Sequence, residues 1–152
     1  MFNPGPLPVD AGGCFLTDNP GAWPDRHELP PLTFVGASGY VLFKADGDTA
    51  QGPDHLGFKL DAAQGEAALF DPSLASIDEI IYGPQTTDVS QGRTPNGGSE
   101  VAFFTQPTPG GPNPGTTNAS GTTPNQVMSG DYGGGPRPSG NWAIGFNVTR
   151  IF

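Results

Sequence analysis

The sequence predicts an all-β fold, and three observations lead to that prediction. No stretch of ten or more residues repeats apolar side chains at helical spacing without an interrupting Gly or Pro. Short runs of β type recur instead, each bounded by Gly, Pro, Asp or Asn. Their spacing of about 8–12 residues is typical of a β-sandwich or a β-barrel.

The predicted strands occupy the first two thirds of the chain. Alternation within them assigns every second side chain to an inner face and places Lys59, Asp61 and Asp78 on the opposite face. Turns are expected at 71–73, which reads Asp-Pro-Ser, and at 95–98, which reads Pro-Asn-Gly-Gly. The predicted strands are 13–17, 26–29, 39–44, 57–60, 66–70, 76–81, 87–91 and 100–104, and the predicted inner-face residues are Tyr40, Leu42, Phe58, Leu60, Ala67, Leu69, Ile77 and Ile81.

Composition divides the 152 residues into three parts. Gly and Pro supply 16 of the 35 residues from 107 to 141, a composition that buries too little apolar surface to offset its ordering entropy. Charge changes at the same place, from -10 over residues 1–106 to +1 after them. We therefore expect a folded domain at 1–108 and a disordered Gly/Pro-rich linker at 109–140.

Residues 141–152 form a terminal β-strand in this prediction. Trp142, Ile144, Phe146 and Val148 alternate with small or polar residues and are the predicted interaction residues. An apolar strand on a long tether needs a sheet edge to pair with. That edge belongs either to the same domain, by fold-back, or to a partner chain, to which the strand is donated.

The charge balance excludes several classes of partner. The net charge is -9, which repels the phosphates of nucleic acids and anionic membrane surfaces. No apolar run approaches the roughly 20 residues that span a bilayer, and the N-terminus has neither the basic nor the apolar region of a signal peptide.

Cys14 is alone in an apolar run, which indicates a buried, inert thiol.

Motifs for catalysis are missing, and one loop is a candidate for an ion. His27-Glu28 and His55 lack the spacing of a metal site, and no Gly-x-Ser-x-Gly elbow is present, so no catalytic residue is assigned. The loop 46–54 carries Asp46, Asp48 and Asp54, whose oxygens suit calcium. It lacks the twelve-residue EF-hand pattern, so a solvated acidic loop is the competing interpretation.

Several short motifs follow one another between residues 2 and 110. They are Phe2-Asn3-Pro4-Gly5, Pro8-Val9-Asp10, Phe15-Leu16-Thr17-Asp18, Arg26-His27-Glu28-Leu29-Pro30, Gly39-Tyr40-Val41-Leu42, Gly57-Phe58-Lys59-Leu60, Gly65-Glu66-Ala67-Ala68-Leu69-Phe70-Asp71, Asp88-Val89-Ser90-Gln91-Gly92-Arg93, Pro95-Asn96-Gly97 and Pro107-Thr108-Pro109-Gly110. In order and spacing they resemble the lamin-tail domain of bacterial secreted and surface proteins. The family's first strand has no counterpart, because Met1 stands where that segment should end.

The resemblance implies an immunoglobulin-like β-sandwich without catalytic residues, at the cell surface or outside the cell. Family members act as interaction modules, so a non-catalytic binding or structural module that contacts a protein or a cell-surface component is the leading hypothesis. A second is an accessory domain that contacts the substrate of a secreted hydrolase or nuclease, with Asp46, Asp48, Asp54 and His55 in a cleft. A third is an assembly subunit that donates residues 141–152 to its neighbour.

Overall fold

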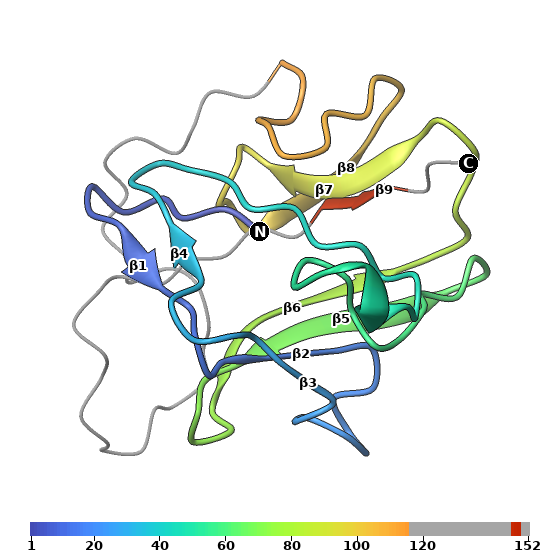
Figure 1. The fold of residues 1–152 in the computed structure, drawn as a ribbon. Helices are drawn as coiled ribbons and strands as arrows, with labels where there is room; N and C mark the ends of the chain where they lie inside the picture. The colour runs from blue at the N-terminus through green and yellow to red at the C-terminus, as the bar shows by residue number, and fades with distance from the viewer. Residues whose placement is uncertain (116–146, 150–152) are drawn as a thin grey trace.

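The computed structural model describes residues 1–115 and 147–149, and it is built from short antiparallel strands (Figure 1). The all-β prediction is confirmed for these residues: the only helix among them is the 3-10 turn η1. The elements are β1 (Val9–Asp10), β2 (Phe15–Thr17), β3 (His27–Glu28), β4 (Phe34–Val35), η1 (Thr49–Gln51), β5 (Gly65–Phe70), β6 (Ser76–Tyr82), β7 (Ser90–Thr94), β8 (Glu100–Phe104) and β9 (Asn147–Thr149).

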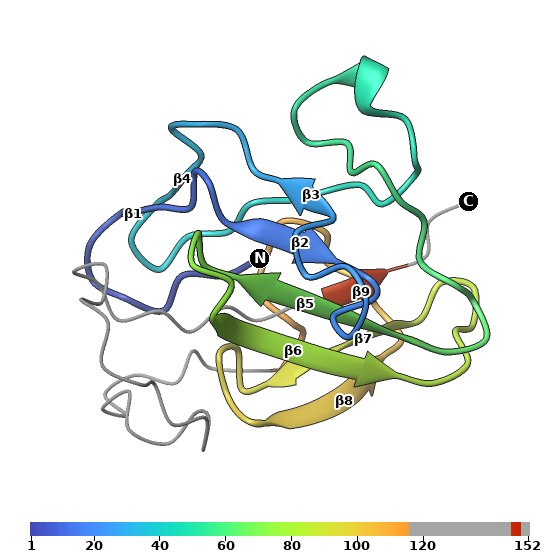
Figure 2. The same ribbon diagram turned by 90° about the horizontal axis from the view of Figure 1, so that it is seen from below.

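The strands form two larger sheets and one small one. One sheet has the order β3-β2-β5-β6, the second has the order β8-β7-β9, and β1 pairs with β4. In Figure 1 the four-stranded sheet lies below the three-stranded one, and Figure 2 shows the same two layers from below. Strands β6 and β8 lie on the same side of the molecule, whereas β3 lies on the opposite side (Figure 2).

The β5–β6 hairpin is the longest paired unit, and its turn is where the sequence predicts one. Asp71 Oδ1 accepts hydrogen bonds from the backbone N–H groups of Ser73 (2.8 Å) and Ala75 (2.9 Å). Such carboxylate-to-backbone bonds substitute for the ladder where the chain reverses. Leu74 takes φ 64° in this turn, and its side chain is exposed.

A register shift in this hairpin overturns two of the predicted orientations. Leu69 pairs with Asp78 but Phe70 pairs with Ser76, so Ile77 is an extra residue in β6. From Asp78 onward the alternation is inverted, and Asp78 (2% exposed) shares the inner face with Leu69. Ile81 is 69% exposed. The prediction that Ile81 lies on the inner face and Asp78 on the outer face is therefore wrong, because strict alternation of side chains does not account for a β-bulge.

The predicted strands at 39–44 and 57–60 do not form. Isolated bridges replace them, pairing Phe2 with Tyr40, Lys44 with His55 and Asp46 with Lys59. Leu42 is consequently 44% exposed, although Phe58 is buried as predicted. Backbone hydrogen bonds from Lys44 N–H to Asp54 O and from Leu56 N–H to Lys44 O close the segment from 44 to 59 into a loop.

The apolar core lies on the inner face of the four-stranded sheet. Cys14 is buried in it, and burial raises the pKa of its thiol to about 11, which keeps it protonated. The buried residues of this core are Ala11, Cys14, Leu16, Leu29, Val35, Leu56, Phe58, Leu69 and Ile77.

Arg93 links the two larger sheets through polar contacts. From β7 its Nη2 donates to Asp78 Oδ1 on β6 (2.6 Å) and to the backbone oxygen of Glu79 (2.8 Å). Nη1 donates to the backbone oxygen of Ser99 (2.9 Å). Burial outweighs this ion pair and raises the pKa of Asp78 to about 6.

The packed chain continues past the predicted domain end at 108. Asn113 is buried, its side chain donates to the backbone oxygen of Arg93 (2.7 Å), and its N–H donates to Asn96 Oδ1 (3.0 Å). The folded part therefore includes at least the start of the segment 109–140. The remainder of that predicted linker lies outside the described residues.

Strand β9 contains the part of the predicted terminal strand that the structure describes. It pairs antiparallel with β7 of the same chain, with Val148 opposite Gln91. This is the fold-back arrangement. Trp142, Ile144 and Phe146 lie outside the described residues.

The β5–β6 pair offers a matched test of packing. A methyl group at Gly65 would lie 2.3 Å from the hydroxyl of Tyr82, whose buried ring covers this cross-strand glycine. We expect Gly65→Ala to lower the free energy of unfolding by about 1–3 kcal/mol. Gly83→Ala, where nothing lies within 4 Å, should change it by less than about 0.5 kcal/mol. Urea unfolding measures both, and equal effects would contradict the described packing.

The raised pKa of Asp78 predicts a pH dependence. Between the unfolded value of 3.8 and the folded value of about 6 the native state binds more protons, so this group stabilises the fold at low pH. That stabilisation is lost as the pH rises through about 6. Relative to Asp78→Asn, the wild type should lose up to about 3 kcal/mol of unfolding free energy between about pH 4 and pH 7. Urea unfolding measures both proteins over this pH range. If their unfolding free energies changed in parallel with pH, the assignment of this pH dependence to Asp78 would be refuted.

Candidate functional site

The loop from 44 to 59 brings together the side chains of Lys44, Asp46, Asp54 and His55. His55 is buried at its base, and its Nδ1 lies 2.5 Å from Asp46 Oδ2. Its Nε2 lies 3.1 Å from Lys44 Nζ, an ammonium that can only donate. These two contacts match the tautomer of a neutral imidazole in which Nδ1 donates to Asp46 and Nε2 accepts from Lys44.

Lys44 occupies the position at which this loop could hold a cation. Its Nζ lies 2.9 Å from Asp54 Oδ2, and Asp54 Oδ1 lies 3.9 Å from His55 Nε2. The hydrogen bond from Lys44 lowers the pKa of Asp54. The ammonium thus stands between the carboxylate and the imidazole nitrogen, which is where a metal ion with these two ligands would bind.

The three carboxylates of the calcium hypothesis are directed to separate partners. Asp46 accepts from the backbone N–H of Asp48, which lowers its pKa, and from His55. Asp48 caps η1, accepting from Ala50 N and from Gln51 Nε2. Within residues 1–115 and 147–149 no group of three Asp, Glu, His or Cys side chains could hold a metal ion. The geometry therefore gives no support to calcium binding by Asp46, Asp48 and Asp54.

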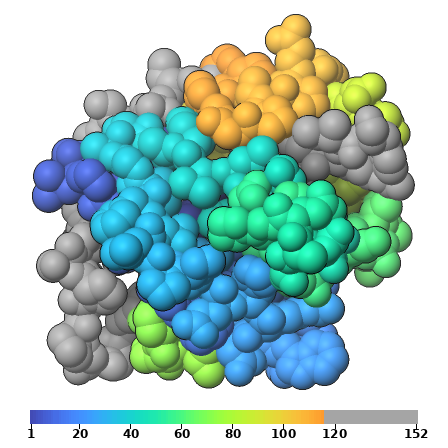
Figure 3. Space-filling view, viewed as in Figure 1, coloured from blue at the N-terminus to red at the C-terminus, as the bar shows by residue number. Residues whose placement is uncertain are grey.

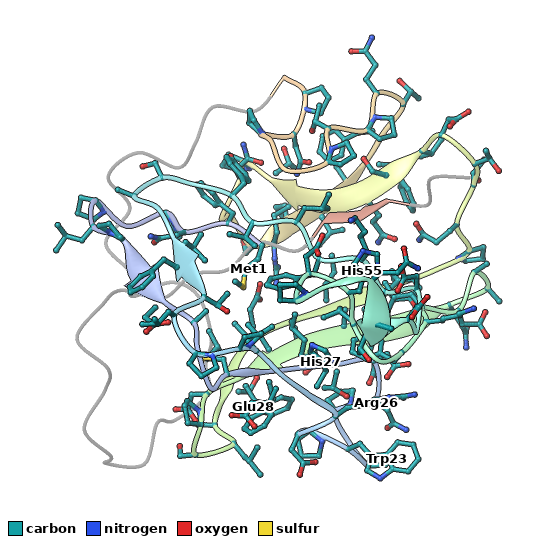
Figure 4. All side chains as sticks on the ribbon, in the orientation of Figure 1. Met1, Trp23, Arg26, His27, Glu28 and His55 are labelled. Carbon is teal, nitrogen blue, oxygen red and sulfur yellow. The ribbon has the colours of Figure 1, made fainter. Side chains whose placement is uncertain are left out.

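The two histidines do not share a site. His27 Nδ1 accepts from the backbone N–H of Gly57 (3.1 Å), whereas the ring nitrogens of His55 face Asp46 and Lys44 (Figure 4). Glu28 is exposed and pairs with Phe15 across β2 and β3. The Asp46–His55 pair resembles the carboxylate–histidine pair that activates a nucleophile in some enzymes. However, His55 Nε2 faces Lys44 instead of a hydroxyl or a thiol.

A second surface feature arises from the loop between β2 and β3. Trp23 is 58% exposed, yet its backbone is fixed: Thr17 Oγ1 donates to its oxygen (2.6 Å), and its N–H donates to Asn19 O (2.9 Å). The Arg26 guanidinium lies 5.4 Å from the ring centroids of both Trp23 and Phe58. Asp18 pairs with Arg26 at 2.5 Å. We call Asp18, Trp23, Arg26 and Phe58 the Trp23 platform.

The Trp23 platform adjoins the acidic loop on one face. Figure 3 shows the segment around Trp23 next to the loop of residues 44–59, and Figure 4 shows Trp23 at the outer end of the platform. The Arg26–Phe58 contact and the His27–Gly57 hydrogen bond join the two segments. No binding role was assigned to Trp23 or Arg26 from the sequence, although Trp23 between Ala22 and Pro24 in a turn-rich segment was a usable signal.

No family model, curated protein sequence or solved structure matches the chain significantly. The lamin-tail resemblance therefore remains a prediction from the motifs alone. Within the described ranges no helix is long and apolar enough to cross a membrane.

His27 provides a test of the link between the two loops. Burial lowers its pKa below 6.5, and protonation of Nδ1 would remove the acceptor that Gly57 uses. A base with a lowered folded-state pKa stabilises the fold above about pH 6.5, and that stability is lost as the pH falls. Relative to His27→Gln, whose amide oxygen can still accept, the wild type should lose stability from about pH 7.5 to pH 5.

Chemical unfolding of both proteins at these two pH values measures this difference, and the Gly57 amide resonance should titrate in the wild type alone. An unchanged stability difference would show that His27 does not link the loops.

Proposed function

We propose that this chain is a non-catalytic binding and structural module, an immunoglobulin-like β-sandwich of lamin-tail type. It contacts a protein or a cell-surface component through the Trp23 platform. The observation that carries this proposal is the exposed indole of Trp23 on a backbone held by Thr17 and Asn19. The two antiparallel sheets support the β-sandwich, and the motif order supports the family.

An exposed, anchored Trp has the properties of a binding hot spot. Trp and Arg are over-represented among residues that dominate binding energy, because they offer a large, stiff contact area. The hydrogen bonds to the Trp23 backbone and the cation–π contact with Arg26 reduce the entropy that binding would otherwise cost. The platform is therefore preorganised in the free protein.

The charge distribution limits the kind of partner. Arg26 is already neutralised by Asp18, and Asp46, Asp48 and Asp54 lie on the adjoining loop. A polyanionic partner would be repelled by this face, whereas a neutral or basic surface with an apolar patch for Trp23 would not. We accordingly propose an extracellular protein or an uncharged cell-surface component.

The test uses the full chain, labelled with a fluorophore and incubated with intact cells of the source organism. Trp23→Ala should weaken saturable binding by at least about tenfold, the scale of a hot-spot residue. Leu74→Ala, which also truncates an exposed apolar side chain, is the matched control and should leave binding unchanged. Flow cytometry over a concentration series measures both.

Three outcomes separate the alternatives. If the wild type shows no saturable binding, the function as a surface-binding module is refuted. Binding that Trp23→Ala leaves intact would place the contact elsewhere on the molecule. Binding to an isolated substrate polymer, with no binding to cells, would instead favour an accessory domain of a hydrolase or nuclease.

A further inference from the structure

Strand β8 is an open sheet edge in the part of the chain that the structure describes. It is the outer strand of β8-β7-β9, and no described strand pairs with its outer side. Natural proteins protect such edges with short strands, charges, Pro or bulges. Strand β8 has five residues, Glu100–Phe104, with no Pro, Gly or Lys, and its register with β7 is unbroken.

The other outer strands of the two larger sheets are protected. Strand β3 has two residues and β9 has three. Strand β6 carries Asp78 and Glu79 and contains the register shift opposite Leu69 and Phe70. Strand β8 is thus the longest of the described outer strands whose register with its neighbour is unbroken.

Two large apolar side chains are exposed on β8. Val101 lies opposite Arg93 and Phe103 lies opposite Gln91, so both project from the same face of the sheet. Val101 is 39% exposed and Phe103 is 62% exposed. An open edge therefore carries its own apolar contact surface.

We propose that the β8 edge pairs antiparallel with the β8 edge of a second copy of this chain, about a two-fold axis at Ala102. Val101 of each copy then lies opposite Phe103 of the other, and Glu100 lies opposite Phe104. Cross-strand neighbours of this kind contact each other directly, and no two like charges are opposed. The two three-stranded sheets join into one continuous six-stranded sheet.

The pattern of β8 favours a second copy over an unrelated strand. Apolar residues stand symmetrically on either side of Ala102, and a two-fold interface requires such self-complementarity. The net charge of -9 on each copy opposes association, so salt should strengthen it by screening. Because the edge is only five residues long, the dimer should be weak and dependent on concentration.

Sedimentation velocity of the full chain over a wide concentration range tests the proposal. We expect the weight-average mass to rise toward twice that of the 15.7 kDa monomer, and to rise further at high salt. The double variant Val101→Lys with Phe103→Lys brings four lysines together around the axis and should weaken association at least about tenfold. Leu74→Lys, on the exposed β5–β6 turn, is the matched control and should associate like the wild type.

A charge pair tests the register itself. In Val101→Glu with Phe103→Lys, each new carboxylate faces the second copy's new ammonium, so low-salt association should recover relative to the double-lysine variant. Thermal unfolding of each variant verifies that its monomer folds, which the exposure of both side chains leads us to expect.

A wild type that stays monomeric at all concentrations and salt conditions would refute the dimer. Undiminished association of the double-lysine variant would also refute it and would direct attention to exchange of β9 between chains. Loss of association in both double variants would overturn the Ala102 register.

Discussion

The buried contact between Arg93 and Asp78 fixes how the two larger sheets sit on each other. Only 34% of the residues are apolar, and the apolar core lies mainly against the four-stranded sheet. The guanidinium joins β7 to β6 and to the turn that follows β7, while the Arg93 backbone oxygen holds Asn113. A buried ion pair adds little net stability, but its directional bonds allow few alternative arrangements of the sheets.

The local features of this fold are largely readable from the sequence. The central hairpin follows from two β-prone runs around Asp71-Pro72-Ser73, and β8 from the apolar run after Gly97-Gly98. Both depend on residues close together in the chain. The register shift at Ile77 does not, because it is decided by how Leu69 and Phe70 meet the opposite strand. One extra residue was enough to move Asp78 into the interior.

The candidate site was less predictable than the fold. The acidic loop was recognisable from its carboxylates, but the partners that bind them were not, because Lys44 and His55 are brought together by an isolated bridge that no alternation pattern indicates. The importance of Trp23 depends on Arg26 and on Phe58, which lies far along the sequence. A single sequence contains no direct record of such contacts. The charge and composition of the chain limit the kind of partner it can bind. The surface proposed for that partner became visible only from the packing of Arg26 and Phe58 around Trp23.

The Trp23 platform and the β8 edge are on opposite sides of the molecule: β3, which follows the Trp23 loop, and β8 lie far apart in Figure 2. Joining two copies at β8 would therefore leave both indoles accessible and pointing away from the junction. On a surface with many identical receptors, such a pair binds twice, and the second event occurs at the high effective concentration set by the first. A contact too weak to hold one copy could then hold two, so avidity would make attachment depend steeply on the local density of the protein.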